Sequence, residues 1–264
     1  SDGVRFTKTE RAAIGEELLP EGFTSCSFRD PNPVVIGDTY YVVVGAQTKE
    51  RAGAVLVYSS RDMSEFKYEF TIENENFGER VNGEMVLTFS VVALKNQDLT
   101  NIDGKASLYA VMNVDFEKKA YEFLHIDSLD EGTDFYAPQT LEDGNGRRIM
   151  LAWLDMWNNN SFSKNNRLVS NGVYTLPRDL VLENGRLLQY PIREVKDIFR
   201  NRFTVAEGGE MSKTAYIEAE MNGGSLFTFG CGDDYISLKI ENGRFTLEQR
   251  QKNHITAVRK GKYR

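Results

Sequence analysis

Histidine and cysteine are scarce in this chain of 264 residues. There are two of each, His125 and His254, and Cys26 and Cys231, and the members of each pair lie far apart. This leaves no spacing typical of a metal site and little material for a histidine-driven triad. Any catalysis by this chain would therefore depend on carboxylates, and we expect no metal.

Long apolar runs and an excess of positive charge are also missing. No apolar stretch approaches the length of a membrane-spanning helix, and the formal net charge is -7. A nucleic-acid partner needs a clustered basic face, which the short basic end "VRKGKYR" does not supply. The polar start "SDG" has no signal-peptide pattern, which leaves both a cytoplasmic and a secreted location open.

What the sequence does contain is short runs rich in Val, Ile, Tyr and Phe between turns of Gly, Asn and Asp. No segment keeps a sustained 3.6-residue apolar period. The pattern predicts an all-β protein, with short helices only near 11–18 and 193–199.

A weak internal repeat groups these strands. The stretches 34–46, 92–114 and 140–156 each run from a strand through a Gly/Asp turn into an apolar strand, and a further strand follows each one. A meander of three or four antiparallel strands over about 50 residues is typical of a propeller blade. The sequence therefore predicts about three blades.

Each repeat opens on an acidic residue: Asp30, Glu84 and Asp134. The first strand of a blade lines the central channel, so we expect the three carboxylates to converge at its mouth. Carboxylates that flank one bond are what a glycosidase needs. The alternative is that they are strand-end acids that face water.

The pattern changes after about residue 200, where alternating apolar and polar runs such as "TAYIEAEM" and "YISLKIENG" are typical of sandwich strands. The stretch "YPIREVKDIFRN" fits a connector between domains. We predict a partial β-propeller over 1–190, a linker over 191–200, and the start of a C-terminal β-sandwich over 201–264.

Three motifs in order give the chain a family resemblance: "FRDP" at 28–31, "TDFYAPQT" at 133–140 and "LPRDLVLENGRLLQYPIREV" at 176–195. They resemble glycoside hydrolase family 32, the invertase, levanase and inulinase group. The resemblance covers nearly the whole chain. It implies a five-bladed propeller with a C-terminal β-sandwich, no metal or organic cofactor, and hydrolysis of β-fructofuranosides such as sucrose, inulin or levan with retention of configuration.

The resemblance also implies roles for individual residues. Arg29 and Asp30 match the motif whose aspartate grips fructose hydroxyls and stabilises the transition state. An arginine beside the carboxylate favours its charged form, which makes the stronger hydrogen bonds to hydroxyls. The alternative is a structural ion pair at the end of a strand.

A second group of residues matches the family's "DFYA" motif. Asp134, Phe135 and Tyr136 would contact the substrate, with the rings offering apolar faces to a sugar; the alternative for the aromatics is packing alone. Trp153 and Trp157 are weaker candidates for the wall of a subsite, with core packing as the alternative for Trp153.

The sequence departs from the family in two places. The family's nucleophile lies in an Asn-Asp-Pro-Asn motif of the first blade, and no such motif occurs in these residues. The family's acid/base is the Glu of a Trp-Glu-Cys-Pro-Asp type motif, and alignment places Leu87 there. A slip of three residues would give that role to Glu84, whose apolar neighbours favour a protonated acid.

Three blades alone would leave open sheet edges, so we expect a missing N-terminal segment or a second chain to complete the propeller; the alternative is a degenerate relative whose propeller no longer closes. Three functions stay open at this point. The first is a fructosidase that is incomplete or inactive on its own, the second a non-catalytic fructan-binding or assembly module, and the third another five-bladed propeller glycosidase.

Overall fold

The computed structural model describes residues 7–8, 10–73, 84–92, 105–130, 132, 134–155, 172–199, 210, 215–251 and 254–262. Almost all of its regular elements are β-strands, which confirms the predicted all-β class. The chain divides into two compact units, Ser1–Leu87 with Ala110–Ile126 and Thr88–Tyr109 with Asp127–Arg264. We call them unit 1 and unit 2 and describe each by itself.

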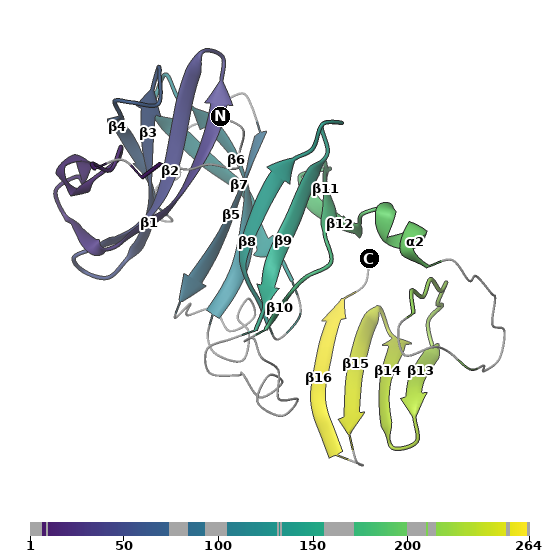
Figure 1. Cartoon of the computed structure of the whole chain (residues 1–264). Coiled ribbons are helices and arrows are strands. Elements are labelled where there is room, and N and C mark those ends of the chain that lie inside the picture. Colours follow the sequence, from purple (N-terminus) through teal and green to yellow (C-terminus); the bar gives the residue numbers. More distant parts are fainter. Residues whose placement is uncertain are drawn as a thin grey trace. The chain divides into compact units, whose positions relative to one another are not determined.

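The first sheet is a meander of four antiparallel strands in chain order (Figure 1). Its strands are β1 (Phe23–Ile36), β2 (Thr39–Thr48), β3 (Gly53–Ser60) and β4 (Lys67–Ile72). Ile36 pairs with Thr39 across a two-residue turn that begins with Gly37, whose φ of 57° suits such a tight hairpin. This sheet is the first predicted blade.

One face of this sheet carries the first apolar core of unit 1. Val42, Val44, Leu56 and Tyr58 are buried there, as the alternation of side chains along a strand requires. The Tyr58 hydroxyl donates to the backbone oxygen of Leu18 at 3.0 Å, and this bond ties the segment before β1 to the sheet. Burial raises the pKa of Tyr58 to about 12.

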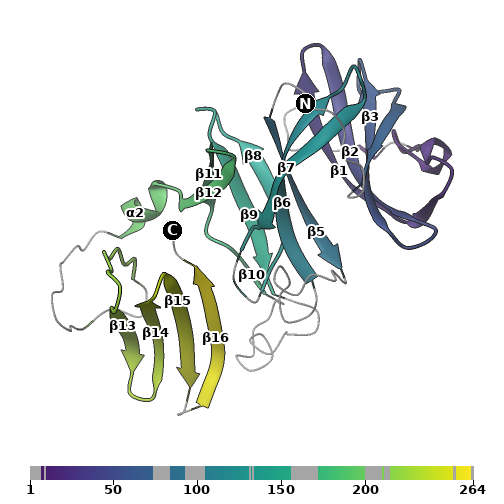
Figure 2. The same cartoon turned by 180° about the vertical axis from the view of Figure 1, so that it is seen from behind.

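The second sheet has the order β5-β6-β7, with β5 (Glu84–Val92), β6 (Lys105–Asp115) and β7 (Ala120–Ser128) (Figure 2). In unit 1, Met112 and Tyr121 pack with Val57 and Phe70 in a second apolar core. The Tyr121 hydroxyl also donates to the backbone oxygen of Glu73 at 2.9 Å. These contacts join β6 and β7 to the first sheet within unit 1.

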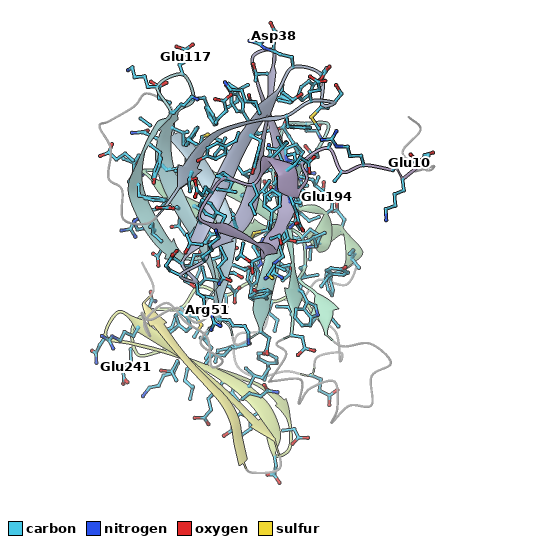
Figure 3. The ribbon with its side chains drawn as sticks, turned by 90° about the vertical axis from the view of Figure 1, so that its left-hand side faces the viewer. Glu10, Asp38, Arg51, Glu117, Glu194 and Glu241 are labelled. Atoms are coloured by element: carbon cyan, nitrogen blue, oxygen red, sulfur yellow. The ribbon has the colours of Figure 1, made fainter. Side chains whose placement is uncertain are left out.

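Turns mark the two ends of unit 1. Figure 3 shows Asp38, in the β1–β2 turn, and Glu117, in the β6–β7 turn, at the same end of this unit, with Arg51 of the β2–β3 turn at the opposite end. The Asp115 carboxylate accepts hydrogen bonds from the backbone nitrogens of Glu117 and Lys118 at 3.0 and 2.9 Å. Such an Asx-type turn closes the hairpin.

The third sheet is built around β9 and lies in unit 2. It contains β8 (Phe135–Glu142), β9 (Arg148–Leu154), β10 (Val173–Tyr174), β11 (Arg178–Glu183) and β12 (Arg186–Pro191). β9 pairs with β8, β10 and β11, all antiparallel. The three sheets confirm the prediction of about three blades.

Helices are short, as predicted. Of the helix expected over 11–18, only η1 (Glu16–Leu18) forms, as one 3-10 turn, and the helix expected over 193–199 is α2 (Glu194–Ile198). In the part of the chain that the structure describes, no helix has the length and apolar character needed to cross a membrane.

Arg147 joins α2 to the β8–β9 turn. Its guanidinium contacts Asp143 at 2.8 Å and donates to both carboxylate oxygens of Glu194 at 2.8 and 3.1 Å. The hydrogen bonds from Arg147 lower the pKa of Glu194 to about 2. Hydrogen bonds from the backbone and side chain of the same arginine lower the pKa of Asp143 far below its usual value.

The C-terminal sheet follows the order β13-β14-β15-β16. Its strands are β13 (Leu226–Cys231), β14 (Asp234–Glu241), β15 (Arg244–Gln251) and β16 (His254–Lys262). This is the expected start of a sandwich. The predicted boundary between propeller, linker and sandwich falls inside unit 2 and stays a prediction.

A strand predicted from "TAYIEAEM" was wrong, because the described residues 215–221 lie outside every strand. The segment contacts α2 through its side chains instead. The Tyr216 ring lies 6.0 Å from that of Phe199, and Glu218 forms an ion pair with Lys196. Of the apolar residues in this segment Tyr216 packs there, while Ile217 stays 40% exposed.

Candidate functional site

Asp30 lies in the middle of β1, in a bulge, and not at the head of a strand as the sequence suggested. Thr24 pairs with Gln47 and Asn32 with Val43, so eight steps along β1 (24 to 32) face four along β2 (47 to 43). The excess residues leave the regular ladder. Asp30 itself has a φ of 60°, in the left-handed region that Asp enters more readily than most residues.

The bulge turns the charged side chains of the motif outward. The side chains of Arg29 and Asp30 are 66% and 80% exposed, and Arg29 Nε lies 3.9 Å from Asp30 Oδ2. An exposed pair at this distance contributes little to stability. Its exposure argues against the structural ion pair, whereas the binding role and the water-facing acid both stay predictions.

Gly45 lies opposite this bulge, where space for a side chain is tight. It pairs with Arg29, and a Cβ at Gly45 would lie 3.3 Å from the backbone oxygen of Arg29. A side chain there would force the bulged strand to shift.

The two acid/base candidates lie in β5. Glu84 is the first residue of that strand and belongs to unit 1; its side chain lies outside the described residues. Leu87, which the alignment places at the family's acid/base position, packs against the second apolar core of unit 1. The structure thus gives Leu87 a packing role, and the role of Glu84 stays a prediction.

The other motif lies at the start of β8, in unit 2. Asp134 directly precedes the strand and is half-buried, Phe135 is 3% exposed, and Tyr136 is half-buried. The burial of Phe135 favours the packing alternative for its ring. Tyr136 is the aromatic residue of the motif that is open enough to contact a sugar.

A second bulge follows Tyr136. The register of β8 and β9 shifts between Tyr136 and Gln139, and Ala137 has a φ of 50°. Phe135 and Pro138 are buried, whereas the two residues between them are more exposed. A regular strand cannot turn two consecutive side chains to one side, so the bulge determines where Tyr136 points.

Tyr136 belongs to a row of aromatic residues across three strands. It lies directly opposite Trp153 of β9, and Trp153 lies directly opposite Tyr174 of β10, which is 78% exposed. Residues opposite each other in a ladder extend their side chains on the same face of the sheet. Trp157 lies outside the described residues.

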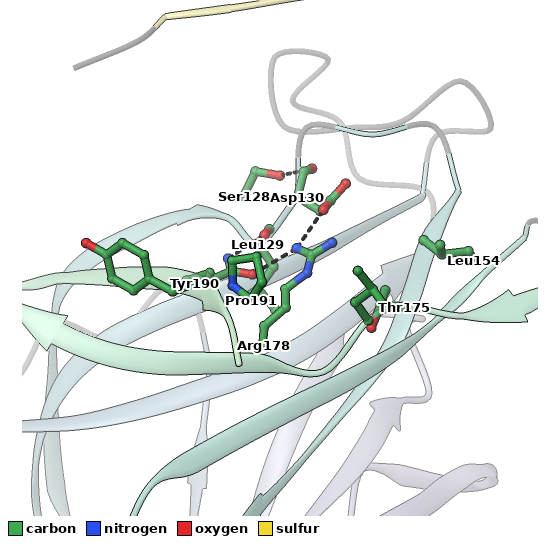
Figure 4. Close-up of a pocket in the computed structure, with 10 residues that line it drawn as sticks. Ser128, Leu129, Asp130, Leu154, Thr175, Arg178, Tyr190 and Pro191 are labelled. Atoms are coloured by element: carbon green, nitrogen blue, oxygen red, sulfur yellow. Dashed lines mark hydrogen bonds and ion pairs between the residues drawn. The ribbon is translucent and has the colours of Figure 1, made fainter. Parts of the chain in front are cut away.

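An arginine network holds the segment that leads into this motif (Figure 4). Arg178 of β11 contacts Asp130 at 2.8 Å and donates to the Gln189 side chain at 2.9 Å, and Gln189 donates to the Leu129 backbone oxygen at 2.6 Å. The guanidinium carbon of Arg178 also lies 4.9 Å from the centre of the Phe135 ring, in a cation–π contact.

A cavity of about 530 Å³ lies beside this network. Its lining includes Asp130, Arg178 and Gln189, with Leu154 and Thr175. Since Arg178 and Asp130 already bind each other, the polar groups of this lining serve first to hold the segment before Asp134.

Sequence reasoning had missed several of these residues. Arg178 and Gln189 lie within the third motif, but the motif alone did not show that they bind the segment before Asp134. Tyr174 carries no motif and becomes notable only through the register of β10. In the described part of the chain, no group of three His, Cys, Asp or Glu side chains is arranged to hold a metal ion.

The candidate residues thus form two clusters, with Arg29 and Asp30 in unit 1 and Asp134, Phe135 and Tyr136 in unit 2. The convergence of Asp30, Glu84 and Asp134 at one channel stays a prediction.

Comparison with known proteins identifies the class. Residues 1–191 match the model of the glycosyl hydrolases family 32 N-terminal domain. The chain belongs to this family, which confirms the resemblance carried by the three motifs. The same match decides against the third alternative, a propeller glycosidase of another family.

Curated relatives agree with the family match. The chain is 32% identical over 216 residues to the sucrose-6-phosphate hydrolase of Bacillus subtilis, which covers 76% of this chain and 44% of that protein. It is 30% identical over 249 residues to the enzyme of the same name from Vibrio alginolyticus, with 87% and 50% covered. The chain therefore spans about half the length of these relatives.

Solved structures support the fold. The chain matches the sucrose-6-phosphate hydrolase of Lactobacillus gasseri with a TM-score of 0.78 at 20% identity, covering 98% of this chain and 58% of that one. It matches the Bombyx mori GH32 β-fructofuranosidase BmSUC1 with a TM-score of 0.71 at 21% identity, covering 100% and 59%. These likenesses agree with a partial propeller.

Proposed function

We propose that the protein is a glycoside hydrolase that acts on β-fructofuranosides with retention of configuration. The observation that carries this proposal is the bulge in β1, which turns Arg29 and Asp30 of the family motif outward with side chains 66% and 80% exposed. An exposed carboxylate beside an arginine is suited to accept hydrogen bonds from the hydroxyls of fructose.

Asp30 then holds the sugar and stabilises the positive charge that develops on the fructosyl ring, and the Arg29 guanidinium lies beside that carboxylate. Asp134 accepts further hydroxyl hydrogen bonds and Tyr136 offers an aromatic face to the sugar. The buried Phe135 lies between the two in sequence and contacts the Arg178 guanidinium. None of these roles requires a metal ion or an organic cofactor.

A retaining mechanism needs two more groups, a nucleophile and an acid/base. Within these residues Glu84 is the candidate acid/base, at the first position of β5. We infer that the nucleophile comes from a further N-terminal segment or a second chain that also completes the propeller. The length of the relatives, of which this chain spans about half, supports that inference.

A second function, a non-catalytic fructan-binding or assembly module, is favoured by one specific observation. Leu87 occupies the aligned acid/base position and packs in the apolar core, where it cannot transfer a proton. A chain that keeps Asp30 and Asp134 but has lost the acid/base would bind sugar without cleaving it.

One experiment distinguishes the two functions. The protein at its full genomic length is incubated with sucrose, inulin and levan, and with sucrose 6-phosphate because of the names of its relatives. Released fructose and binding are both measured. Release of fructose that Asp30→Asn abolishes supports the hydrolase, and binding without release supports the module.

Two further variants sharpen this test. Glu84→Gln should abolish release without abolishing binding if Glu84 is the acid/base. Asp38→Asn is the matched control, because Asp38 is another exposed aspartate of the same hairpin and lies in its turn. Equal losses in Asp30→Asn and Asp38→Asn would contradict the role proposed for Asp30.

A further inference from the structure

Two serine side chains close a hydrogen-bonded circuit around the backbone of Tyr136. The backbone nitrogen of Ala137 donates to Ser90 Oγ at 3.1 Å, and Ser90 Oγ lies 3.0 Å from Ser107 Oγ. Ser107 Oγ in turn donates to the backbone oxygen of Phe135 at 3.3 Å. The two serines therefore hold the residues on either side of Tyr136.

The direction of these hydrogen bonds follows from the groups at the two ends. A backbone nitrogen can only donate, a backbone oxygen can only accept, and each serine hydroxyl has a single hydrogen. Ser107 gives its hydrogen to Phe135, so Ser90 must give its own to Ser107 and accept the bond from Ala137. The circuit has one consistent orientation and needs both hydroxyls.

The circuit lies where the backbone is most constrained. Ala137 has a φ of 50°, which is uncommon for a residue with a side chain, and its side chain is exposed. Packing of that methyl group cannot hold the conformation, whereas the bond from the Ala137 nitrogen to Ser90 constrains it directly. Strained backbone persists only where its surroundings fix it, and it is often found at functional sites.

Tyr136 lies between the two residues that the circuit holds, and the direction of its side chain decides whether the ring can contact a sugar. The bulge at Ala137 leaves Tyr136 opposite Trp153, in the aromatic row that Tyr174 continues. If the bulge relaxed into regular strand, the register would slip and the side chains would change faces. The circuit thus acts on the direction of Tyr136, although neither serine belongs to the aromatic row.

We propose that Ser90 and Ser107 are positioning residues that fix Tyr136 as the aromatic wall of the fructoside site. The two serines come from β5 and β6, whereas Tyr136 lies on β8, so the circuit joins two sheets within unit 2. The proposal rests on the function proposed above, in which Tyr136 contacts the sugar.

The test is a double-mutant cycle in the protein at its full genomic length. Ser107→Ala is expected to weaken the binding of fructosides on the order of tenfold, raising KM more than it lowers kcat. In a Tyr136→Ala background the same change should have no further effect, because the ring it positions is absent. Ser107→Thr keeps a hydroxyl and should restore most of the affinity.

Ser60→Ala serves as the matched control. Ser60 is as buried as Ser107, each being 5% exposed, and its hydroxyl also serves backbone groups, those of Asp62 and Met63. A similar melting temperature for Ser60→Ala and Ser107→Ala, with weakened binding only in the latter, separates positioning from general destabilisation. Unchanged affinity in Ser107→Ala, or an equal loss with and without Tyr136, overturns the proposal.

Hydrogen exchange at the Ala137 amide gives a readout that needs no sugar. Ser90→Ala removes the acceptor and should speed that exchange, while the amides of β2 stay protected. If the wild-type protein binds no fructoside, the proposed function fails, and slow exchange at Ala137 that depends on Ser90 still supports the holding role. Exchange at Ala137 that does not change in Ser90→Ala contradicts it.

Discussion

Asp30 and Ala137 both take a left-handed backbone conformation without being glycine. Each such residue costs about 1–2 kcal/mol relative to ordinary backbone. Both lie in bulges beside the two family motifs, where they change the direction of a neighbouring side chain. The motifs predicted that Asp30 and Tyr136 matter, but not these conformations. Ser90 and Ser107 were beyond prediction, because a serine within an apolar strand has no distinctive pattern.

Gly172 is a glycine that has no room for a side chain. It has a φ of 74°, and a Cβ there would lie 2.7 Å from both Asp155 Cβ and the Leu154 oxygen and would also collide with Trp153 Nε1. We expect Gly172→Ala to destabilise the protein by more than about 3 kcal/mol, through strain plus overlap with the aromatic row. Denaturant unfolding measures this.

Gly185→Ala is the control for that change. Gly185 has a similar φ of 71°, but nothing lies within 4 Å of its Cβ position. Gly185→Ala should lower the free energy of unfolding only by the backbone strain of the new residue, about 1 kcal/mol. If Gly172→Ala and Gly185→Ala lost equal free energy of unfolding, overlap with Trp153 and its neighbours would not contribute to the loss.

The raised pKa of Tyr58 predicts that the protein loses stability at alkaline pH. Its pKa is about 12 in the folded protein because of burial, above the ordinary value of 10.0. The folded state therefore holds this proton more tightly, and the associated stability is complete below pH 10 and is lost as the pH rises through about 12. The slope of melting temperature against pH above pH 10 should be smaller in Tyr58→Phe. Identical slopes would contradict the burial.

The elements of the fold were more predictable than their irregularities. Alternating apolar residues and Gly/Asp turns predicted the three sheets, because both signals are local in sequence. The bulges in β1 and β8 depend on pairing with β2 and β9, so a single strand does not reveal them. The segment 215–221 shows the opposite error, a strand-like pattern without a partner strand.

The contact between Arg147 and α2 should depend on pH. Arg147 lowers the pKa of Glu194 to about 2, from an ordinary 4.5. The contact therefore stabilises the fold fully above about pH 4.5, and its contribution is lost as the pH falls through about 2. The difference in melting temperature between wild type and Arg147→Ala should be largest near neutral pH and should shrink as the pH falls towards 2, where only the contact with Asp143 remains.

Arg148→Ala is the neighbouring control for this element. Among the described residues Arg148 forms an ion pair with Glu142 alone, at 2.9 Å, and both side chains are about half exposed. An exposed pair of this kind contributes little, so its removal should leave stability nearly unchanged. A larger effect of Arg148→Ala than of Arg147→Ala would refute the special role of Arg147.

For the molecule as a whole, the open edges of its sheets predict self-association. β1 and β4 each have only one neighbouring strand in the described sheet, and Val35 and Ile36 on β1 are 60% and 41% exposed. Unprotected edges with apolar side chains pair with other chains. The 264-residue chain alone should therefore show a mass in light scattering that rises with concentration.

Val35→Lys should reduce this association, because a charge on an edge strand discourages pairing. Met63→Lys is the control, since Met63 is similarly exposed, at 42%, but lies outside the strands. A mass that stays monomeric at every concentration would remove the reason to expect a completing partner.

Sequence motifs identified the family over most of the chain, whereas the convergence of the acids depends on how blades assemble and is not encoded in any one blade.

The unequal pairing of β1 and β2 has a consequence for how this family can vary. The ladder is regular again from Asn32 to Ile36, whatever the number of residues looped out before it. An insertion or deletion between Thr24 and Arg29 would therefore change the reach of the Asp30 carboxylate without altering the hairpin that supports it. Such a change would also move Phe28, whose ring lies 6.1 Å from that of Tyr58 in the first apolar core, so the length of this stretch is coupled to the packing beneath it.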